Sequence, residues 1–289
     1  MNPPVRIHFL VHMHRPDAIE AAGRVGKLLL SKGVEVFAEP DAAMAVGLPE
    51  IAINDVCSAD LVVTFGGDGT LIRAAQYCSE SGTPILGVYY GRFGFVTQCH
   101  PNEIGAALSQ FIDGKSHIDS RMMVEAQIHR DGKLVATLSA LNEAVVQRAA
   151  TTRILDFEVV IDGKFVTQYA ADGLIVSTPT GSTAYNLSAG GPIVDPKLDA
   201  LILSAITPHT LNTRSLVFGP DSVIDIRIET RGDAVLSCDG SHRLAVLSGD
   251  KIRIVRQSVR TNLVCVDEHD FLTKLGDRLL GARHTGADA

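Results

Sequence analysis

Residues 61–75 constrain the fold of this chain more than any other stretch, because an apolar strand pattern runs directly into a glycine loop and then into a helix pattern. The run Leu61–Phe65 is apolar, and the loop Gly66-Gly67-Asp68-Gly69-Thr70 follows it. Three glycines in four positions allow a tight turn and the close approach of a ligand. A helix that starts here offers unpaired N–H groups and its positive dipole end to a phosphate. The stretch therefore predicts a phosphate-binding loop between a strand and a helix.

Asp68 stands in the middle of the glycine loop. A carboxylate repels phosphate, so an aspartate at this position indicates a general base or a contact to Mg2+. The alternative is an ordinary tight turn with an aspartate at the start of a helix. The lysine-containing P-loop pattern does not occur in the sequence, so the loop is not of the Walker type.

The first 118 residues alternate strand and helix patterns. Strand patterns cover residues 5–11, 34–37, 61–65 and 84–89, and helix patterns cover 17–32, 71–81 and 101–113, with a short helix or loop over 47–57. Such alternation predicts a Rossmann-like parallel α/β domain, whose ligands bind at the carboxyl ends of the strands. The glycine loop lies at such an end. Residues 91–95 follow another strand and are either part of the same site or a loop with a buried phenylalanine.

From residue 119 the pattern changes to successive strands, with apolar or alternating runs at 122–128, 134–141, 157–161, 174–177, 223–229, 234–237 and 251–255. Asp131-Gly132 and Asp162-Gly163 predict hairpin turns. We therefore expect an all-β, sandwich-like domain over residues 119–267. Residues 268–280 return to helical spacing and predict a helix that packs back on the first domain. The predicted domains are thus residues 1–118 together with 268–289, and residues 119–267.

Residues 172–192 are dense in glycine and small hydroxyl side chains. A strand ends at Ser177, a turn with Gly181 follows, and a helix is expected to start at about residue 182, which leaves backbone N–H groups and hydroxyls facing one spot. This arrangement favours a nucleoside or a sugar as the ligand, with Tyr185 as a stacking face or a phenolic partner. The alternative, a capped helix joined by a turn, does not explain so many small polar groups.

Asn142 and Glu143 interrupt the apolar run from Leu138 to Val146. An amide beside a carboxylate in a strand pattern is either a pair of rim residues or a site that reads adenine and ribose hydroxyls. The residues alone leave both interpretations open.

Composition narrows the class of ligand and the compartment. A net charge of −7 without a basic block argues against nucleic acid as the main partner, so an anionic ligand must be held by local groups. No run approaches the about 18 apolar residues of a membrane span. The N-terminus lacks the pattern of a signal peptide, which favours the cytoplasm. The five cysteines show no CxxC spacing and are expected to be buried small hydrophobes.

With these features in place, the sequence resembles the NAD kinases, the ATP- or polyphosphate-dependent enzymes that convert NAD to NADP. The resemblance spans nearly the whole chain, and its motifs are residues 66–70, 142–143, 172–192, 208–211 and 274–276. The first motif is shared with phosphofructokinases and with diacylglycerol and sphingosine kinases, so it identifies only a phosphoryl-transfer superfamily. The long motif at residues 172–192 is far more specific.

The resemblance implies roles for individual residues. Asp68 would be the general base that deprotonates the adenosine ribose 2′-hydroxyl, and Asn142 and Glu143 would contact the adenosine. The glycine loop would hold the donor phosphates through Gly66, Gly67, Gly69 and Thr70. The other implied positions of substrate contact are Gly69, Arg73, Phe95, Arg153, Ala170, Asp172, Thr180, Thr183, Ala184, Tyr185, Ser188 and Ser241.

The resemblance also implies the cofactors and the assembly. Mg2+ or another divalent metal would bridge the oxygens of the donor, ATP or polyphosphate, and the metal ligands stay unknown. The site would lie between the two domains of a homodimer or homotetramer, with a contribution from a neighbouring subunit.

The sequence departs from the family pattern at a few positions. Ala170 stands where relatives carry Arg or Gly, and Ala cannot supply a charge, so preference between NAD and NADH stays open with a lean to the looser specificity. Tyr89 and Phe93 replace an Asn and a Leu, which bears on the shape of the loop at residues 91–95. Two alternative functions remain: a lipid kinase of the diacylglycerol or sphingosine type, and a non-catalytic dinucleotide sensor.

Overall fold

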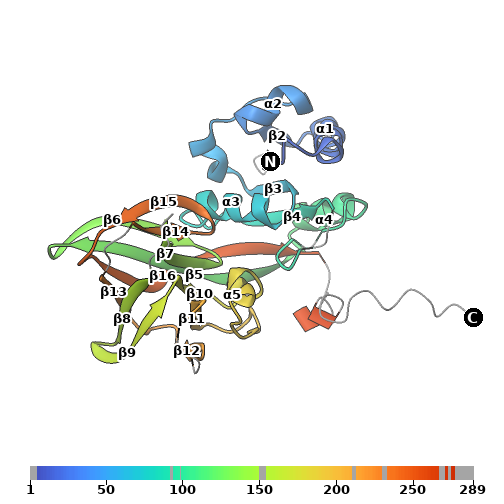
Figure 1. Ribbon diagram of the computed structural model, residues 1–289. Coiled ribbons are helices and arrows are strands. Elements are labelled where there is room, and N and C mark those ends of the chain that lie inside the picture. Colours follow the sequence, from blue (N-terminus) through green and yellow to red (C-terminus); the bar gives the residue numbers. More distant parts are fainter. Residues whose placement is uncertain are drawn as a thin grey trace, which may run out of the picture. The chain divides into compact units, whose positions relative to one another are not determined.

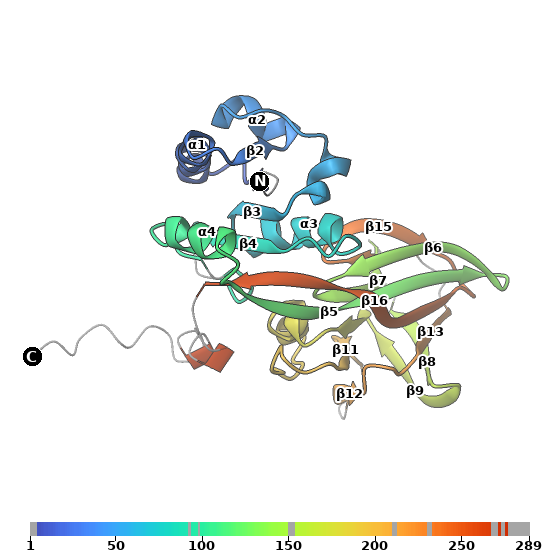
Figure 2. The same cartoon turned by 180° about the vertical axis from the view of Figure 1, so that it is seen from behind.

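The computed structural model describes residues 5–91, 94–97, 99–149, 154–209, 213–229, 233–266, 271–272 and 275–276. The chain divides into two compact units, Met1–Ser120 with Thr261–Ala289, and Arg121–Arg260. Figures 1 and 2 show its helices and strands from opposite sides. Two long strands, β5 (His117–Arg130) and β16 (Lys251–Cys265), each have residues in both units. Within the described part of the chain, no helix has the length and apolar character needed to cross a membrane.

The first unit contains a parallel sheet, as the alternating pattern predicts. Its strands follow the spatial order β2-β1-β3-β4, and every one of these pairings is parallel. The end of β16 joins β4 in parallel register at Leu263 and Ile85. The strands are β1 (Arg6–Val11), β2 (Glu35–Ala38), β3 (Leu61–Gly66) and β4 (Ile85–Tyr89). The helices are α1 (Pro16–Ser31), α2 (Pro40–Val46), the 3-10 helix η1 (Ile53–Ser58), α3 (Asp68–Cys78) and α4 (Ile104–Ile112).

Alternation along the strands assigns the helices to the two faces of this sheet. Ile7, Phe9 and Val11 of β1 belong to one buried cluster, which also contains buried residues of α1, α2 and α4. Helix α3 lies against the other face, because a Cβ on Gly87 of β4 would clash with the side chain of Leu71. Strands covered on both faces explain why β3 is buried along its whole length.

Some helices of the first unit differ from the sequence-based expectation. Helix α3 begins at Asp68 instead of residue 71, because the backbone already becomes helical directly after Gly67. Helix α2 was not predicted, and η1 occupies the region expected to be a short helix or loop. The predicted end of α1 is confirmed, since Gly33 takes the left-handed conformation with φ of 79°.

The second unit is all-β, as predicted, and consists of two layers of strands. One layer is a six-stranded antiparallel sheet in the order β12-β11-β10-β7-β14-β15. Its strands are β7 (Glu143–Arg148), β10 (Gly173–Ser177), β11 (Leu201–Ile206), β12 (Leu216–Phe218), β14 (Ala234–Cys238) and β15 (Ser241–Val246). The other layer contains parts of β5 and β16 with β6 (Lys133–Ala140), β8 (Leu155–Ile161), β9 (Lys164–Ala171) and β13 (Ile224–Glu229). Buried side chains of both layers form one core around Phe157.

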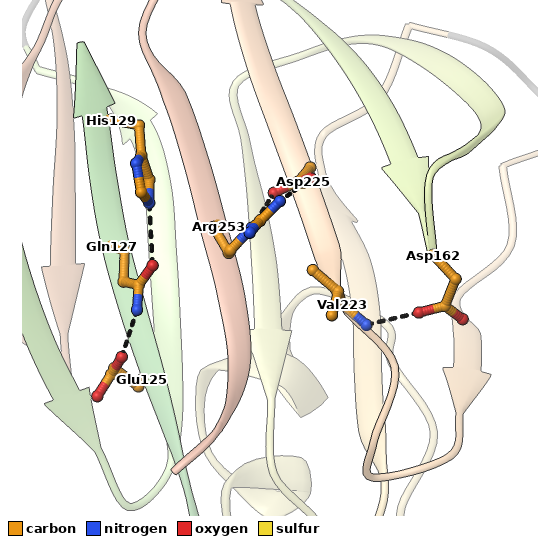
Figure 3. Close-up of polar contacts among 7 residues, drawn as sticks. All are labelled: Glu125, Gln127, His129, Asp162, Val223, Asp225 and Arg253. Carbon is orange, nitrogen blue, oxygen red and sulfur yellow. Dashed lines mark hydrogen bonds and ion pairs between the residues drawn. The ribbon is translucent and has the colours of Figure 1, made fainter. Parts of the chain in front are cut away.

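The layer that contains β5 keeps a polar outer face (Figure 3). On β5 the side chain of Gln127 donates to Glu125 at 2.6 Å and lies 2.9 Å from His129 Nε2. Arg253 of β16 forms two hydrogen bonds with Asp225 of β13, at 2.8 and 2.9 Å. The alternate residues of β5 point into the core: Val124, Ala126 and Ile128. This alternation is typical of an antiparallel sheet with one solvated face.

Both predicted Asp-Gly hairpins are confirmed. Asp131 and Gly132 have φ values of 50° and 76°, and Asp162 and Gly163 have φ values of 50° and 77°. Two consecutive positive φ angles match the type I′ turn, whose twist suits antiparallel strands. In the second hairpin the Asp162 carboxylate also accepts the backbone N–H of Val223 at 2.8 Å, as Figure 3 shows.

Other strands and the final helix were predicted less completely. The apolar run over residues 138–146 is divided between β6 and β7, which belong to different layers. Strands β11, β12 and β15 were not predicted, and β16 extends far beyond the expected 251–255. Of the C-terminal helix, the described residues 271–272 and 275–276 are helical, and the Phe271 ring lies 6.4 Å from the Phe95 ring of the first unit. The rest of the predicted helix and the tail lie outside the described residues.

The hairpin geometry predicts opposite effects for two glycine-to-alanine substitutions. Gly163 and Gly105 both have open space where a Cβ would stand, but only Gly163 has a positive φ. Gly163→Ala should lower the free energy of unfolding by about 1 kcal/mol, because Ala is strained in that conformation. Gly105→Ala, in the exposed part of α4, should raise it by about 0.5–1 kcal/mol. Urea unfolding measures both changes. A destabilised Gly105→Ala variant would contradict the placement of Gly105 in an open, helical position of α4.

Candidate functional site

The glycine loop connects β3 directly to α3. Gly66 is buried at the end of β3, and a Cβ there would overlap the side chain of Thr70. Positions 67 and 69 face open space instead. Of the described glycines with positive φ, none belongs to this loop. The loop glycines therefore permit close approach of the chain or of a ligand, and the tight turn does not depend on a left-handed conformation.

Asp68 is the first residue of α3, and its carboxylate holds the segment after β4. Oδ2 accepts the N–H of Phe95 at 2.9 Å. Oδ1 accepts the N–H groups of Val96 at 3.3 Å and Thr97 at 2.9 Å, and also the Thr97 hydroxyl at 2.9 Å. Gly94 must be a glycine, because a Cβ would overlap the Asp68 carboxylate. The predicted contact residue Phe95 thus reaches Asp68 through its backbone, and its ring lies against Phe271.

The four hydrogen bonds are shared unequally between the two carboxylate oxygens. A carboxylate offers about four lone-pair positions, two on each oxygen. Oδ1 has three donors, and Oδ2 has one among the described residues. Oδ2 is therefore the oxygen that can accept a further hydrogen bond, from a hydroxyl or N–H group of a ligand.

A cavity of about 570 Å3 lies over the glycine loop, within the first unit. Its wall includes every residue of the loop except Asp68, together with Arg73, Tyr90, Glu39 and the residues that follow β1. The predicted contact residue Arg73 donates to Glu39 Oε1 at 2.7 Å, and the same oxygen accepts the N–H of Val11 at 2.8 Å. The Tyr90 hydroxyl is buried without a hydrogen-bond partner among the described residues, and burial raises the pKa of Tyr90 to about 12.

Sequence reasoning missed the part of this cavity that follows β1. His12, His14 and Arg15 line it together with the loop. The available signal was the parallel sheet itself, because β1 pairs with β3 and their carboxyl ends must reach the same edge. Arg15 is paired with Asp17 at 2.8 Å on the exposed side.

In the second unit the structure brings together two motifs that are distant in the sequence. The carbonyl of Asn142 accepts the N–H of Thr178 at 2.8 Å and the Ser177 hydroxyl at 3.2 Å. A Cβ on Gly181 would overlap the backbone of Asn142, so only glycine permits this approach. The motif at residues 142–143 and the motif at residues 172–192 therefore form one cluster.

Two side-chain oxygens in this cluster are buried without a partner among the described residues. They are Asn142 Oδ1 and Glu143 Oε2, and each residue is only 6% exposed. Among the described residues, the backbone N–H of Tyr185 also approaches the Glu143 carboxyl. A buried polar group without a partner costs about 1–3 kcal/mol, so native proteins seldom contain one without a reason. A ligand that pairs with both oxygens would supply that reason.

Asp239 holds Asn142 and Glu143 in place, and sequence reasoning did not identify it. Its carboxylate accepts the N–H groups of Leu141 at 2.8 Å, Asn142 at 2.8 Å and Glu143 at 3.1 Å. Its own N–H donates to the Glu143 carbonyl at 3.0 Å. The residue lies in the Asp-Gly turn between β14 and β15, with φ of 51°. Ser241, a predicted contact residue, follows this turn, and its hydroxyl donates to the Cys238 carbonyl at 3.0 Å.

Burial controls the ionisation of these two acids. The pKa of Glu143 is raised from 4.5 to about 8, mainly by burial and further by the negative charge of the neighbouring Asp239. The backbone N–H of Tyr185 acts in the opposite direction and lowers it. Burial also raises the pKa of Asp239, which the three backbone N–H groups oppose. The Glu143 carboxyl therefore holds its proton to a higher pH than a solvent-exposed glutamate does.

Several polar side chains of residues 172–192 are engaged inside the cluster instead of facing a ligand. Ser177, Thr178, Ser182 and Asn186 are all buried. The Thr178 hydroxyl donates to the Leu141 carbonyl at 2.6 Å, and Asn186 binds the carbonyls of Ser182 and Pro192. The hydroxyls of Ser177, Thr178 and Ser182 thus make hydrogen bonds within the cluster, and the gathering of hydroxyls at one spot for a ligand stays a prediction. These hydrogen bonds stabilise the turn that carries Tyr185.

The expected helix in this region is also shorter than predicted. The chain forms a 3-10 helix, η2 (Thr180–Thr183), and one turn, α5 (Tyr185–Ser188), which lies beside β10 in Figure 1. Thr180 is buried and accepts a hydrogen bond from Arg121 at 3.4 Å, while Thr183 and Ala184 are half-buried. Tyr185 and Ser188 are exposed.

The remaining predicted contact positions lie at the other end of β10. Asp172 pairs with Arg148 at 3.0 Å. The carbonyl of Ala170 accepts the N–H of His209 at 2.9 Å. Arg153 lies outside the described residues. For every predicted site residue the role in binding or catalysis stays a prediction.

Both units match models of known protein families. The ATP-NAD kinase N-terminal domain model matches residues 7–116, and the ATP-NAD kinase C-terminal domain model matches residues 141–266. An NAD kinase of Symbiobacterium thermophilum is 38% identical over 276 residues, covering 94% of this chain and 98% of the relative. An NAD kinase of Moorella thermoacetica is 39% identical over 277 residues, covering 95% of this chain and 89% of the relative.

Solved structures agree with these matches. The crystal structure of yeast NADH kinase complexed with NADH has a TM-score of 0.90 at 26% identity, covering 100% of this chain and 91% of that one. An NAD kinase from Archaeoglobus fulgidus in complex with ATP has a TM-score of 0.77 at 25% identity, covering 96% and 99%.

An α/β unit with a glycine loop before a helix, and an all-β unit with a buried amide and acid, define a kinase of two domains. The chain belongs to the NAD kinase family. The predicted fold class, family and kinase activity are confirmed. Membership of this family also sets aside the lipid-kinase alternative.

The raised pKa of Glu143 predicts a pH-dependent effect of Glu143→Gln on stability. Between about pH 4.5 and 8 the folded chain holds a proton that the unfolded chain releases, so this residue's contribution to stability falls as pH rises through that window. Gln does not titrate. The free energy of unfolding of Glu143→Gln relative to wild type should therefore rise from pH 5 to pH 8, by up to about 4 kcal/mol.

Urea unfolding at several pH values measures this difference. Glu158→Gln, at a partly exposed glutamate of β8 that pairs with Arg227, is the matched control and should follow wild type at every pH. A difference between Glu143→Gln and wild type that stays constant from pH 5 to pH 8 would show that Glu143 ionises normally.

Proposed function

We propose that this chain phosphorylates the 2′-hydroxyl of the adenosine ribose of NAD to give NADP, with ATP or polyphosphate as the donor. Membership of the NAD kinase family supports the reaction. The observation that carries the proposal is the Asp68 carboxylate, held in a fixed orientation at the start of α3 while Oδ2 keeps room for a proton donor.

Asp68 acts as the general base in this reaction. Its Oδ2 accepts the proton of the 2′-hydroxyl while the ribose oxygen forms a bond to the terminal phosphorus of the donor. The bond from that phosphorus to the bridging oxygen breaks, and ADP or the shortened polyphosphate leaves. Because the transition state is loose, the protein contributes mainly alignment of the two reactants and stabilisation of charge.

The donor phosphates bind at the glycine loop through Gly66, Gly67, Gly69 and Thr70. The cavity of about 570 Å3 over this loop and the start of α3 support that placement. Arg73 lines the same cavity, but its guanidinium forms an ion pair with Glu39. To contact a phosphate, the Arg73 side chain must either bind the phosphate and Glu39 at the same time or move away from Glu39.

The adenosine binds at Asn142 and Glu143, whose buried oxygens Asn142 Oδ1 and Glu143 Oε2 lack partners among the described residues. The exposed ring of Tyr185 is available for stacking. Further proposed contacts to the dinucleotide come from Gly69, Phe95, Arg153, Ala170, Asp172, Thr180, Thr183, Ala184, Ser188 and Ser241. Ala170 supplies no charge, which supports acceptance of NADH as well as NAD.

A divalent metal such as Mg2+ belongs to this proposal as a partner of the donor oxygens, whose charge it would neutralise. The described residues contain no group of three or more His, Cys, Asp or Glu side chains that could hold a metal ion. A cage made by the protein does not fit that part of the chain, so no catalytic step is assigned to the metal. We also propose a cytoplasmic homodimer or homotetramer.

The direct test is an assay of the purified chain for NADP formation. NAD and NADH are each incubated with Mg2+ and either ATP or polyphosphate, and NADP or NADPH is measured with a dehydrogenase. We expect product with NAD and at least one donor, because family membership and the loop geometry both support this reaction. Tight binding of NAD without product in any combination would favour a dinucleotide sensor.

The role of Asp68 predicts the behaviour of Asp68→Asn. The amide cannot take a proton, so kcat should fall by roughly 10²–10⁴-fold. Its single carbonyl oxygen can take the place of Oδ1 and accept the N–H groups of Val96 and Thr97, while the amide nitrogen loses the bond to the N–H of Phe95. NAD affinity should therefore fall much less than kcat. Initial rates and calorimetric titration with NAD measure the two effects.

Asp60→Asn is the matched control in the same unit, because the Asp60 carboxylate accepts the exposed N–H of Arg6 and lies outside the proposed site. It should leave both kcat and NAD affinity unchanged. Loss of NAD binding in Asp68→Asn with normal turnover of the remaining complex would reject Asp68 as the base.

A further inference from the structure

Glu143 occupies a buried position where negative charge is already present. Asp239 and Cys238 face it from the end of β14, and the N–H of Tyr185 approaches it from α5. Ser177 of β10 lies opposite it in the strand register and carries no charge. Arg121 of β5 reaches η2 through Thr180, but among the described residues the charge that acts on Glu143 is that of Asp239.

The two acids differ in how many hydrogen bonds support their charged forms. Asp239 accepts three backbone N–H groups, from Leu141, Asn142 and Glu143. The Glu143 carboxyl receives one, from Tyr185, and its Oε2 has no partner among the described residues. When two carboxyl groups share a buried region, the better hydrogen-bonded one keeps the charge and the other retains its proton.

We propose that Glu143 meets the substrate as a neutral carboxylic acid, with its Oε2–H donating a hydrogen bond to an acceptor atom of the adenosine, and that Asp239 is the positioning residue that keeps the proton there. The inference rests on the proposed function, since it concerns the nucleoside that the second unit is proposed to bind. The burial of Glu143 at 6% exposure and the unpaired Oε2 are the geometric basis. The donor of this hydrogen bond thus belongs to the protein and the acceptor belongs to the substrate.

Ionisation of Glu143 would weaken binding in two ways. It would remove the donor, and it would place a second negative charge beside Asp239 in a buried region. NAD itself carries no group that titrates between about pH 6 and 9, so a change in affinity over this range must come from the protein. The raised pKa of Glu143, about 8, lies inside that range.

The test is calorimetric titration of the full chain with NAD from pH 6.5 to pH 9.5, in buffers with different heats of ionisation. We expect the Kd to be level below pH 8 and to rise toward tenfold per pH unit above it, because each binding event then requires a proton to be taken up. Net proton uptake should accordingly be near zero at pH 6.5 and approach one at pH 9.5. Proton release on binding, with affinity that improves as pH rises, would overturn the proposal.

Glu143→Gln shows whether the ligand needs the neutral acid or the charged carboxylate at this position. The amide of Gln donates a hydrogen bond as the neutral acid does, so this variant should bind NAD within a few-fold of wild type at pH 6.5 and lose the decline above pH 8. Glu158→Gln is the control and should keep the wild-type profile. A folded Glu143→Gln protein whose affinity is reduced 100-fold or more at every pH would show that the ligand needs a carboxylate.

Asp239→Asn tests the positioning role. Removal of the neighbouring charge should move the midpoint of the affinity profile to lower pH, while a purely structural residue would change affinity equally at all pH values. If this variant does not fold, the Glu143→Gln comparison still decides the proposal. Failure of the wild-type chain to bind NAD at any pH would instead reject the proposed function, so the two failures are distinguishable.

Discussion

Hydrogen bonds from the backbone to a carboxylate hold the candidate site residues within each unit. Asp68 accepts the N–H groups of Phe95, Val96 and Thr97, and Asp239 accepts those of the three consecutive residues 141–143. Bonds to an ionised acceptor are about twice as strong as neutral ones. Each aspartate therefore fixes the backbone of one irregular segment against a regular element, α3 in the first unit and β14 in the second.

The same interaction leads to different chemistry in the two units. Asp68 uses most of its acceptor capacity to hold a loop, and the asymmetry between Oδ1 and Oδ2 leaves one oxygen suited to take a proton. Asp239 is buried and uses its capacity on the backbone of Glu143 and its neighbours. Its charge then disfavours ionisation of the Glu143 side chain. One aspartate thus keeps an acceptor position on Oδ2, and the other spends its capacity on the backbone of residues 141–143.

Glycines at two positions allow these contacts. Gly94 lets the chain pass directly over the Asp68 carboxylate, and Gly181 lets η2 approach the backbone of Asn142. Neither residue has a positive φ, so both are needed because of close packing and not because of a left-handed turn. Polar side chains such as Thr178 and Asn186 then complete the hydrogen bonds of the turn that carries Tyr185. In the second unit, therefore, much of the dense polar sequence serves to build the site.

Local patterns in the sequence determined the order of strands and helices in the first unit, both type I′ hairpins, the all-β character of the second unit, and the positions of Asp68, Asn142 and Glu143. These depend on interactions among residues a few positions apart, such as side-chain periodicity and turn conformation. Only the tertiary structure decided that Asp239 holds residues 141–143, that residues 138–146 divide between two layers, and that the segment after β1 lines the cavity over the glycine loop. The contact between Asp239 and residues 141–143 joins positions nearly a hundred residues apart. The division of residues 138–146 and the place of the segment after β1 depend on which strands pair with one another. The periodicity of a single segment does not specify its partner.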